Sequence, residues 1–320
     1  MPGPGTCPRC GAPRVQALDC PRCGVIYAKA EAHALAAAVA ELPEVAETRD
    51  VAETWPGEDS DEALELRLRT FAIPFALAVA AVAVWSNLGH FFVRTFASMW
   101  VHETGHAVAA WLCGYLAFPG PWFTPVANAR SPILAVAIAG ALGYGAFRCW
   151  KADRRTLAAT SVGLLAIQLC CTLFLGARAA RQFIVFAGDG GCLVLGTLLM
   201  ATVYARREGA IRRGWLRWGF LAIGAVSFAD AFAQWWGSRS DPDRIPFGHN
   251  EGSGLSDPSV LTELFGWSET ALVRRYVVLG CVCLVALAAA YWWGLAQTRR
   301  SLRREAGYRS MSAESSPDIA

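Results

Sequence analysis

Long apolar runs constrain this chain more than any other feature of its sequence. They begin at Phe71 and recur as far as Ala296, and most are close to the ~20 residues with which an α-helix crosses the hydrocarbon core of a bilayer. Only 17% of the residues are charged, which is too few for the solvated surface of a soluble protein. The sequence therefore predicts an all-α polytopic membrane protein. Its candidate spans are residues 71–88, 96–117, 132–147, 157–176, 183–205, 216–236 and 271–296.

Basic clusters between these runs indicate the cytoplasmic side of the membrane. They lie at residues 67–69, 148–155, 206–217 and 299–304, whereas the segment 237–270 holds six acidic and two basic residues and fits the opposite side. No signal peptide is recognisable at the start of the chain. We therefore expect an integral protein of a prokaryotic inner membrane, with both termini in the cytoplasm.

The number of apolar runs conflicts with this orientation at one place. Three runs lie between Arg67 and Lys151, yet an even number of crossings is needed if both residues are cytoplasmic. We expect six to seven apolar segments in all. Either one of them is re-entrant, for which the run at 96–117 is the natural candidate, or two of them act as a single broken span. Such a segment is allowed at membrane depth when protein or a water-filled cavity surrounds it.

That run carries the motif H-E-x-x-H, from His102 to His106. Two histidines four residues apart lie on one face of a helix, where both can bind one Zn²⁺, and Glu103 stands where it can take a proton from a zinc-bound water. Polar groups of this kind are costly within a membrane and are seldom present without a function. The motif therefore predicts a catalytic zinc site with Glu103 as general base.

A catalytic zinc ion usually has three protein ligands. Asp189 is the best candidate for the third, because it opens an apolar run and is flanked by glycines that allow close backbone approach. The alternative for Asp189 is an ordinary helix N-cap. Rival third ligands are Asp230, His249 and Glu251.

Two identical C-P-R-C-G motifs occupy the N-terminus. They place Cys7, Cys10, Cys20 and Cys23 in the spacing of a structural zinc site. So short a segment cannot bury a hydrophobic core, so a metal ion must stabilise it. We expect a zinc ribbon over residues 1–27, and therefore two Zn²⁺ ions in the whole chain, one structural and one catalytic.

The remaining boundaries follow from composition. Residues 28–66 form a helix-prone and then acidic flexible tether, with ten acidic residues and one base between Glu41 and Glu65. Residues 67–304 form the membrane domain, and residues 305–320 a disordered tail. The seven cysteines outside the ribbon lack ligand spacing and are expected to be small buried apolar residues.

Together, the H-E-x-x-H motif in an apolar segment and the distant Asp189-Gly190 resemble the site-2 protease-type intramembrane zinc metalloproteases. The resemblance covers roughly residues 92–200 and implies that His102, His106 and Asp189 bind zinc and that Glu103 is the catalytic base. It implies hydrolysis of peptide bonds in membrane-embedded substrates. The Asn-Pro element of that family is missing from residues 182–188.

Two other classes of function remain open. One is a non-hydrolytic membrane zinc-binding sensor or scaffold that presents the ribbon to a protein partner, for which Glu103 would not be needed. The other is a transporter, although the internal repeats typical of transporters are not visible. The expected partners are the lipid bilayer, a membrane-protein or peptide substrate and a protein that binds the ribbon, and no nucleic acid is expected.

Overall fold

The computed structural model describes residues 6–7, 9–30, 56–205, 215–250 and 254–314. The chain divides into two compact units, Met1–Asp61 and Glu62–Ala320, which are described separately below.

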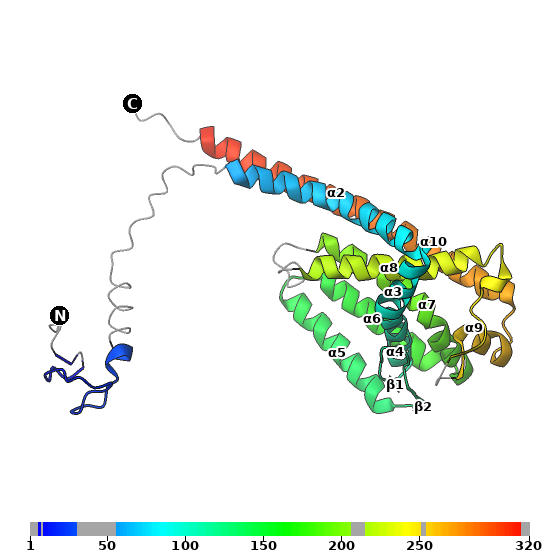
Figure 1. Cartoon of the computed structure of the whole chain (residues 1–320), viewed down its shortest axis with the longest axis horizontal. Coiled ribbons are helices and arrows are strands. Elements are labelled where there is room, and N and C mark those ends of the chain that lie inside the picture. The colour runs from blue at the N-terminus through cyan, green and yellow to red at the C-terminus, as the bar shows by residue number, and fades with distance from the viewer. Residues whose placement is uncertain (1–5, 8, 31–55, 206–214, 251–253, 315–320) are drawn as a thin grey trace. The chain divides into compact units, whose positions relative to one another are not determined.

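The larger unit is almost entirely helical (Figure 1). Its helices are α2 (Pro56–Trp85), α3 (Asn87–Val93), the π-helix η1 (Arg94–Ser98), α4 (Met99–Leu112), α5 (Pro132–Lys151), α6 (Arg155–Phe174), α7 (Ala177–Ala201), η2 (Thr202–Tyr204), α8 (Leu216–Gly237), η4 (Pro242–Arg244), α9 (Asp257–Ser259), the π-helix η5 (Val260–Leu264) and α10 (Glu269–Glu314). Its strands form two small antiparallel pairs, β1 (Tyr115–Ala117) with β2 (Val126–Arg130) and β3 (His249–Asn250) with β4 (Gly254–Leu255).

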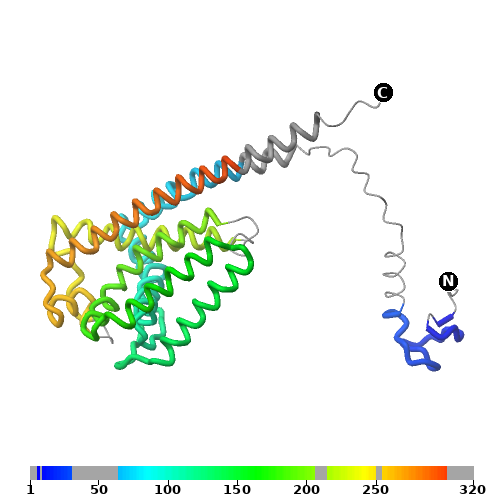
Figure 2. The backbone as a smooth tube through the Cα atoms, turned by 180° about the vertical axis from the view of Figure 1, so that it is seen from behind, coloured from blue at the N-terminus to red at the C-terminus, as the bar shows by residue number. Residues whose placement is uncertain are grey.

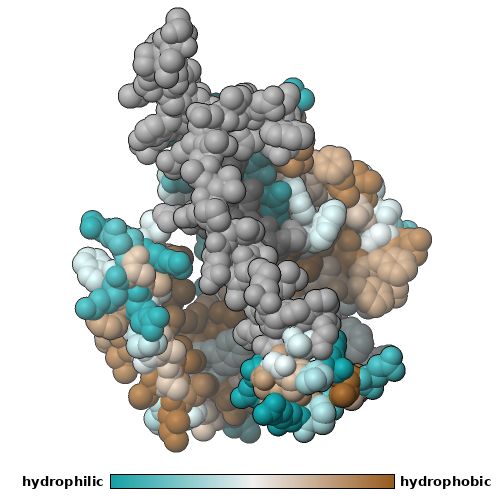
Figure 3. Space-filling model, turned by 90° about the vertical axis from the view of Figure 1, so that its left-hand side faces the viewer, coloured by the Kyte–Doolittle hydropathy of each residue, from teal (hydrophilic) through white to brown (hydrophobic). Residues whose placement is uncertain are grey.

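Six helices in the described part of the chain are long and apolar enough to cross a membrane. They cover residues 64–85, 132–151, 155–174, 177–204, 216–237 and 269–300. Their outward faces are apolar, with side chains such as Val82, Ile133 and Phe174 more than 70% exposed, and Figure 3 shows broad apolar areas on one face. These features are consistent with an integral membrane protein.

The expected run at 96–117 is the one that does not form a long helix of its own. Its helical part ends at Leu112, and Gly114, at φ 78°, turns the chain into β1. A glycine takes this backbone conformation without strain. Only α2 and α5 therefore count as candidate spans between Arg67 and Lys151, which meets the even number that the basic clusters require.

Helix α7 lies at the centre of the unit, packed against α4, α8 and α10, and Figure 2 shows these helices from behind. Glycines set its closest contacts. A Cβ atom added to Gly105 of α4 would lie 2.1 Å from the carbonyl oxygen of Ala187, and one added to Gly191 would lie 2.5 Å from the Cα atom of Gly105. Small residues at such contacts let the backbones of membrane helices approach closely.

Polar side chains form hydrogen bonds between the outer helices. The buried Gln168 of α6 donates to the carbonyl oxygen of Ala135 in α5 at 3.1 Å. Arg69 of α2 donates to Thr298 of α10 at 2.7 Å, and α2 and α10 run side by side in Figures 1 and 2.

Helix reaches into the residues assigned to the tether and to the tail. Residues 56–66, assigned to the flexible tether, belong to α2, and residues 305–314, assigned to the disordered tail, continue α10. In both places the apolar span extends into polar helix-forming sequence. The rest of the tether, residues 31–55, and the last six residues lie outside the described part of the chain.

The contact between α4 and α7 leads to the first prediction. Gly105→Ala should lower the free energy of unfolding by about 1–3 kcal/mol, because the added methyl group has no space against Ala187. Denaturant unfolding of the purified protein in detergent measures the change. Gly143→Ala in α5 is the matched control, since nothing lies within 4 Å of its Cβ position. Equal stability of the two variants would show that this contact does not limit the packing.

Candidate functional site

A cavity of about 460 Å³ lies where α4, α7, the β1–β2 hairpin and the start of α9 meet. His102, Glu103 and His106 of α4 line one wall, and Asp189 of α7 and Asp257 of α9 line others. Glu103 is only 4% exposed. The cavity therefore brings the H-E-x-x-H motif together with two carboxylates that are distant in the sequence.

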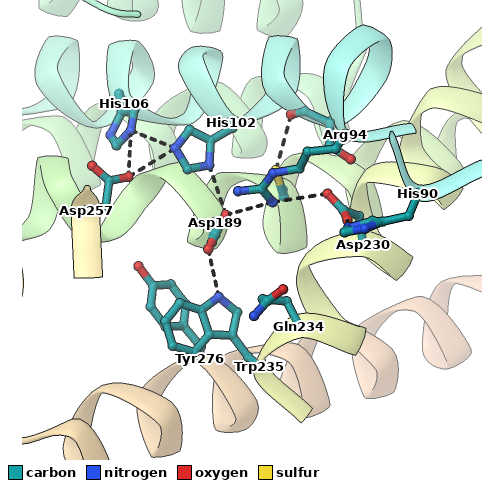
Figure 4. A network of polar contacts seen from close by, with 12 residues as sticks. His90, Arg94, His102, His106, Asp189, Asp230, Gln234, Trp235, Asp257 and Tyr276 are labelled. Carbon is teal, nitrogen blue, oxygen red and sulfur yellow. Dashed lines mark hydrogen bonds and ion pairs between the residues drawn. The ribbon is translucent and has the colours of Figure 1, made fainter. Parts of the chain in front are cut away.

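The two histidines point toward the same place from successive turns of α4 (Figure 4). Their Nε2 atoms lie 3.1 Å apart. Gly188 of α7 leaves the space that they need, because a Cβ atom there would lie 2.6 Å from Nε2 of His102. The glycines around Asp189 thus serve close approach, as their spacing suggested.

Asp257 completes this cluster. Its Oδ2 atom lies 3.0 Å from Nε2 of His102 and 3.1 Å from Nε2 of His106. This oxygen is buried and makes no hydrogen bond with any described residue. Asp257 is the first residue of α9, and Pro258 follows at a helix start where its missing N–H costs nothing.

Contacts on the far side of each ring fix which nitrogen carries the proton when the ring is neutral. Nδ1 of His106 lies 2.7 Å from the carbonyl oxygen of Ile184, which can only accept, so this nitrogen carries the proton. Nδ1 of His102 lies 2.9 Å from Asp189, whose other oxygen accepts a hydrogen bond from Trp235 at 2.8 Å. Both Nε2 atoms then direct lone pairs at each other and at Asp257, an arrangement that a cation between the three atoms would stabilise.

The spacing suits zinc. Ligand atoms of a tetrahedral zinc site lie roughly 3.3 Å apart, because each is about 2.0 Å from the ion. The three distances here are 3.0, 3.1 and 3.1 Å, and His102, His106 and Asp257 form a group that could hold a metal ion. Two imidazoles and a carboxylate are a common ligand set for zinc.

Asp189, the predicted third ligand, does not join His106 in that group. Its carboxylate lies at Nδ1 of His102, on the opposite side of the ring from His106, and it forms a separate group with His102 and Cys192. The glycines around Asp189 indicated close approach but not to which nitrogen of His102, so its role as third ligand stays a prediction. The geometry instead gives Asp189 the place of a carboxylate that orients a histidine ligand.

The rival candidates lie elsewhere. Asp230 is 1% exposed and pairs with His90 at 3.0 Å and with Arg94 at 3.1 Å. His249 belongs to β3 and to none of the metal-binding groups in the described residues. Glu251 lies outside the described part of the chain.

A polar stripe along α3, η1 and α4 connects Asp230 to the metal-binding group. His90, Arg94, Ser98, His102 and His106 follow one another at intervals of four residues. In a regular α-helix, residues four positions apart are rotated by about 40° around the helix axis at each step, so such a stripe gradually leaves the face. The π-helix η1 takes one more residue per turn and rotates the face back by about 100°, so Arg94 remains beside the site, 3.8 Å from Asp189.

Sequence reasoning missed Asp257, Arg94 and Trp235. Asp257 stands in the polar segment that was assigned to the side of the membrane opposite the basic clusters, about 150 residues after the motif. Only its position before a proline marked a helix start. Arg94 had a visible signal, since it shares the four-residue spacing of the two histidines. Trp235 had none, because aromatic residues are common throughout the spans.

The smaller unit holds the four N-terminal cysteines together. The Sγ atoms of Cys7 and Cys23, and those of Cys10 and Cys20, lie 3.7 Å apart, close to the roughly 3.8 Å expected around a tetrahedral zinc ion. Burial raises the pKa of Cys20, but hydrogen bonds from the backbone of Arg22 and Cys23 outweigh it and bring the pKa to about 6. The four thiols form a group that could bind a metal ion.

Comparisons of the chain with protein-family models, curated proteins and solved structures find no match.

The two groups lead to separate predictions about metal. In the purified full chain, Asp257→Ala should remove the zinc at α4 during dialysis against a mild chelator, because two imidazoles alone hold the ion weakly. Asp189→Asn should keep that site but weaken it by about 10–100-fold, as expected for a residue that orients a ligand. Metal analysis measures both effects, with Asp243→Ala, exposed in the same polar segment, as the control. Zinc retained in Asp257→Ala but lost in Asp189→Asn would reverse the two assignments.

For the N-terminal group, Cys7→Ser or Cys20→Ser should remove one zinc ion and leave the other, because the two groups belong to different compact units. Zinc content per chain measures this directly. Cys149→Ser is the control, since that thiol is in no metal-binding group of the described residues. Loss of both ions from a ribbon variant would contradict the independence of the units.

Proposed function

We propose that this chain is an intramembrane zinc metallopeptidase of the site-2 protease type, which hydrolyses peptide bonds of membrane-embedded substrates. The observation that carries the proposal is the position of Glu103, buried in the same cavity as the converging atoms of His102, His106 and Asp257. A residue that only held a metal would not need this neighbour, whereas hydrolysis needs a base beside the metal.

Zinc bound by these three residues would polarise the scissile carbonyl and lower the pKa of water toward ~7. Glu103 takes the proton of the attacking water and returns it to the leaving amine. Its backbone is fixed by Thr124 of the hairpin, whose hydroxyl donates to the carbonyl oxygen of Glu103 at 2.9 Å. The backbone of the base is therefore tied to the hairpin that lines the same cavity.

Asp189 acts on His102 rather than on substrate. It accepts a hydrogen bond from Nδ1 of His102, and Trp235 donates a second one to its other oxygen at 2.8 Å. A carboxylate in this position keeps the ring in one tautomer and makes it a stronger ligand. Arg94, 3.8 Å away, offsets the buried charge of Asp189 and is itself held by Asp230.

The remaining lining of the cavity favours apolar substrates. Trp122 and Phe123 of the hairpin, Met99 of α4 and Ile184 of α7 form much of the wall. Trp122 and Phe123 are 63% and 54% exposed. Such a surface fits the side chains of a membrane-spanning segment better than those of a soluble peptide.

The six candidate spans support a membrane location with both ends of the larger unit on one side. We place that side in the cytoplasm because the basic clusters lie there. The N-terminal unit then forms a cytoplasmic structural zinc ribbon for a protein partner.

The decisive variant is Glu103→Gln. It should lower cleavage of membrane-spanning reporter proteins by at least about 10²-fold, because glutamine cannot take the proton, while zinc content stays at the wild-type level. New termini are identified by mass spectrometry after reconstitution with a pool of single-span reporters. Glu263→Gln, an exposed acid of η5, is the control.

Wild-type turnover in Glu103→Gln would refute this mechanism. If neither protein cleaves any reporter, the proposal of an enzyme fails and a non-hydrolytic zinc-binding scaffold takes its place.

A further inference from the structure

A second recess, of about 560 Å³, lies between α7 and α10 and shares no lining residue with the metal-binding cavity. We name it the α7–α10 groove. Its lining residues are Ala179, Gln182, Phe183, Phe186, Trp267, Arg274, Arg275, Val278, Leu279 and Val282. The proposed peptidase mechanism uses none of them.

One end of the groove is apolar and open to the surface of the spans. Val278 and Val282, one turn apart on α10, are 55% and 59% exposed. They face Phe183 of α7 across the recess. Since both helices are candidate spans, this part of the groove lies against the acyl chains of the bilayer.

The other end of the groove is basic. Arg274 and Arg275 are exposed, and neither forms an ion pair with a described residue. Arg178 and Arg181, near the start of α7, differ because both donate to backbone carbonyl oxygens. Two adjacent arginines without an acidic partner among the described residues leave positive charge at the mouth of the groove.

The side of the membrane makes this charge unusual. Helices α7 and α10 both run toward the basic clusters at residues 206–217 and 299–304, so their first residues lie on the opposite side. Arginines are disfavoured on that side of a membrane protein. The pair Arg274 and Arg275 on that side therefore indicates a binding site for a negatively charged ligand.

The groove is also preformed. The guanidinium of Arg275 stacks on Trp267 at 3.8 Å. Phe186 stacks on Tyr276 at 4.3 Å, and the hydroxyl of Tyr276 donates to the carbonyl oxygen of Phe186. Binding there would order few side chains, which lowers its entropic cost.

We propose that the α7–α10 groove binds an anionic phospholipid from the leaflet opposite the basic clusters. Arg274 and Arg275 hold the phosphate, with the amide of Gln182 within the same lining, and one acyl chain lies along Phe183, Val278 and Val282. Charge complementarity selects this ligand, because basic recesses between membrane helices bind anionic headgroups.

Native mass spectrometry of the full chain tests the proposal. The protein is equilibrated in detergent with equal amounts of phosphatidylglycerol and phosphatidylcholine of identical acyl chains. The wild type should retain one phosphatidylglycerol in preference to phosphatidylcholine. The double variant Arg274→Gln/Arg275→Gln should lose this preference, and Arg299→Gln/Arg300→Gln, with the same charge change at the far end of the span, should keep it.

Val278→Trp distinguishes lipid binding in the groove from lipid binding by surface charge alone, because the new side chain fills the apolar end and leaves both arginines in place. It should also lose the bound lipid, while circular dichroism confirms that each variant is folded. Unchanged retention in Val278→Trp would overturn the groove, since charge alone would then explain binding. Equal retention of the two lipids by the wild type, or unchanged selectivity in Arg274→Gln/Arg275→Gln, would overturn recognition of the phosphate by these arginines.

Discussion

Two imidazole rings whose Nε2 atoms converge on one carboxylate oxygen are the interaction on which the rest of this structure depends. The far nitrogen of each ring donates a hydrogen bond, in His106 to the carbonyl oxygen of Ile184 and in His102 to the carboxylate of Asp189. The two Nε2 atoms lie 3.1 Å apart, and that of His106 lies 3.1 Å from the buried Oδ2 atom of Asp257. In neutral rings both Nε2 atoms then carry lone pairs, so a cation at this point would find a ligand set of two imidazoles and a carboxylate.

The helix packing can be understood as the means of bringing these atoms together. Helix α4 must lie almost against α7, and the glycines at 105, 188 and 191 remove the Cβ atoms that would prevent it. In a membrane this packing carries unusual weight, because lipid chains are as apolar as the helix surfaces and give little hydrophobic drive for association. The π-helix η1 then keeps Arg94 on the same face, where it offsets the charge of Asp189.

The sequence predicted the parts of this arrangement that are local. Apolar runs located the spans, the basic clusters required an even number of crossings before Lys151, and the motif placed two histidines on one face of a helix. The cysteine spacing anticipated the N-terminal group. Each of these features depends on residues a few positions apart, for which helix geometry and turn chemistry are sufficient guides.

The third carboxylate could not be found in the same way. Asp189 and Asp257 both stand at membrane depth or near it, and which of them reaches the Nε2 atoms depends on how α7 and the segment before α10 fold over α4. That is set by tertiary packing between residues about 80 to 150 positions apart, and no short-range pattern encodes it. The extension of α2 and α10 into polar flanking sequence has another cause, since a stable span can propagate helix beyond its apolar residues.

X-ray absorption at the zinc edge tests the central claim most directly. The protein would carry serine at Cys7, Cys10, Cys20 and Cys23, so that only the site at α4 contributes to the spectrum. The account predicts a first shell of nitrogen and oxygen alone at about 2.0 Å, with the scattering of two imidazoles, and a loss of one oxygen in Asp257→Ala. A sulfur ligand at about 2.3 Å, which would point to Cys192, or a shell unchanged by Asp257→Ala, would contradict it.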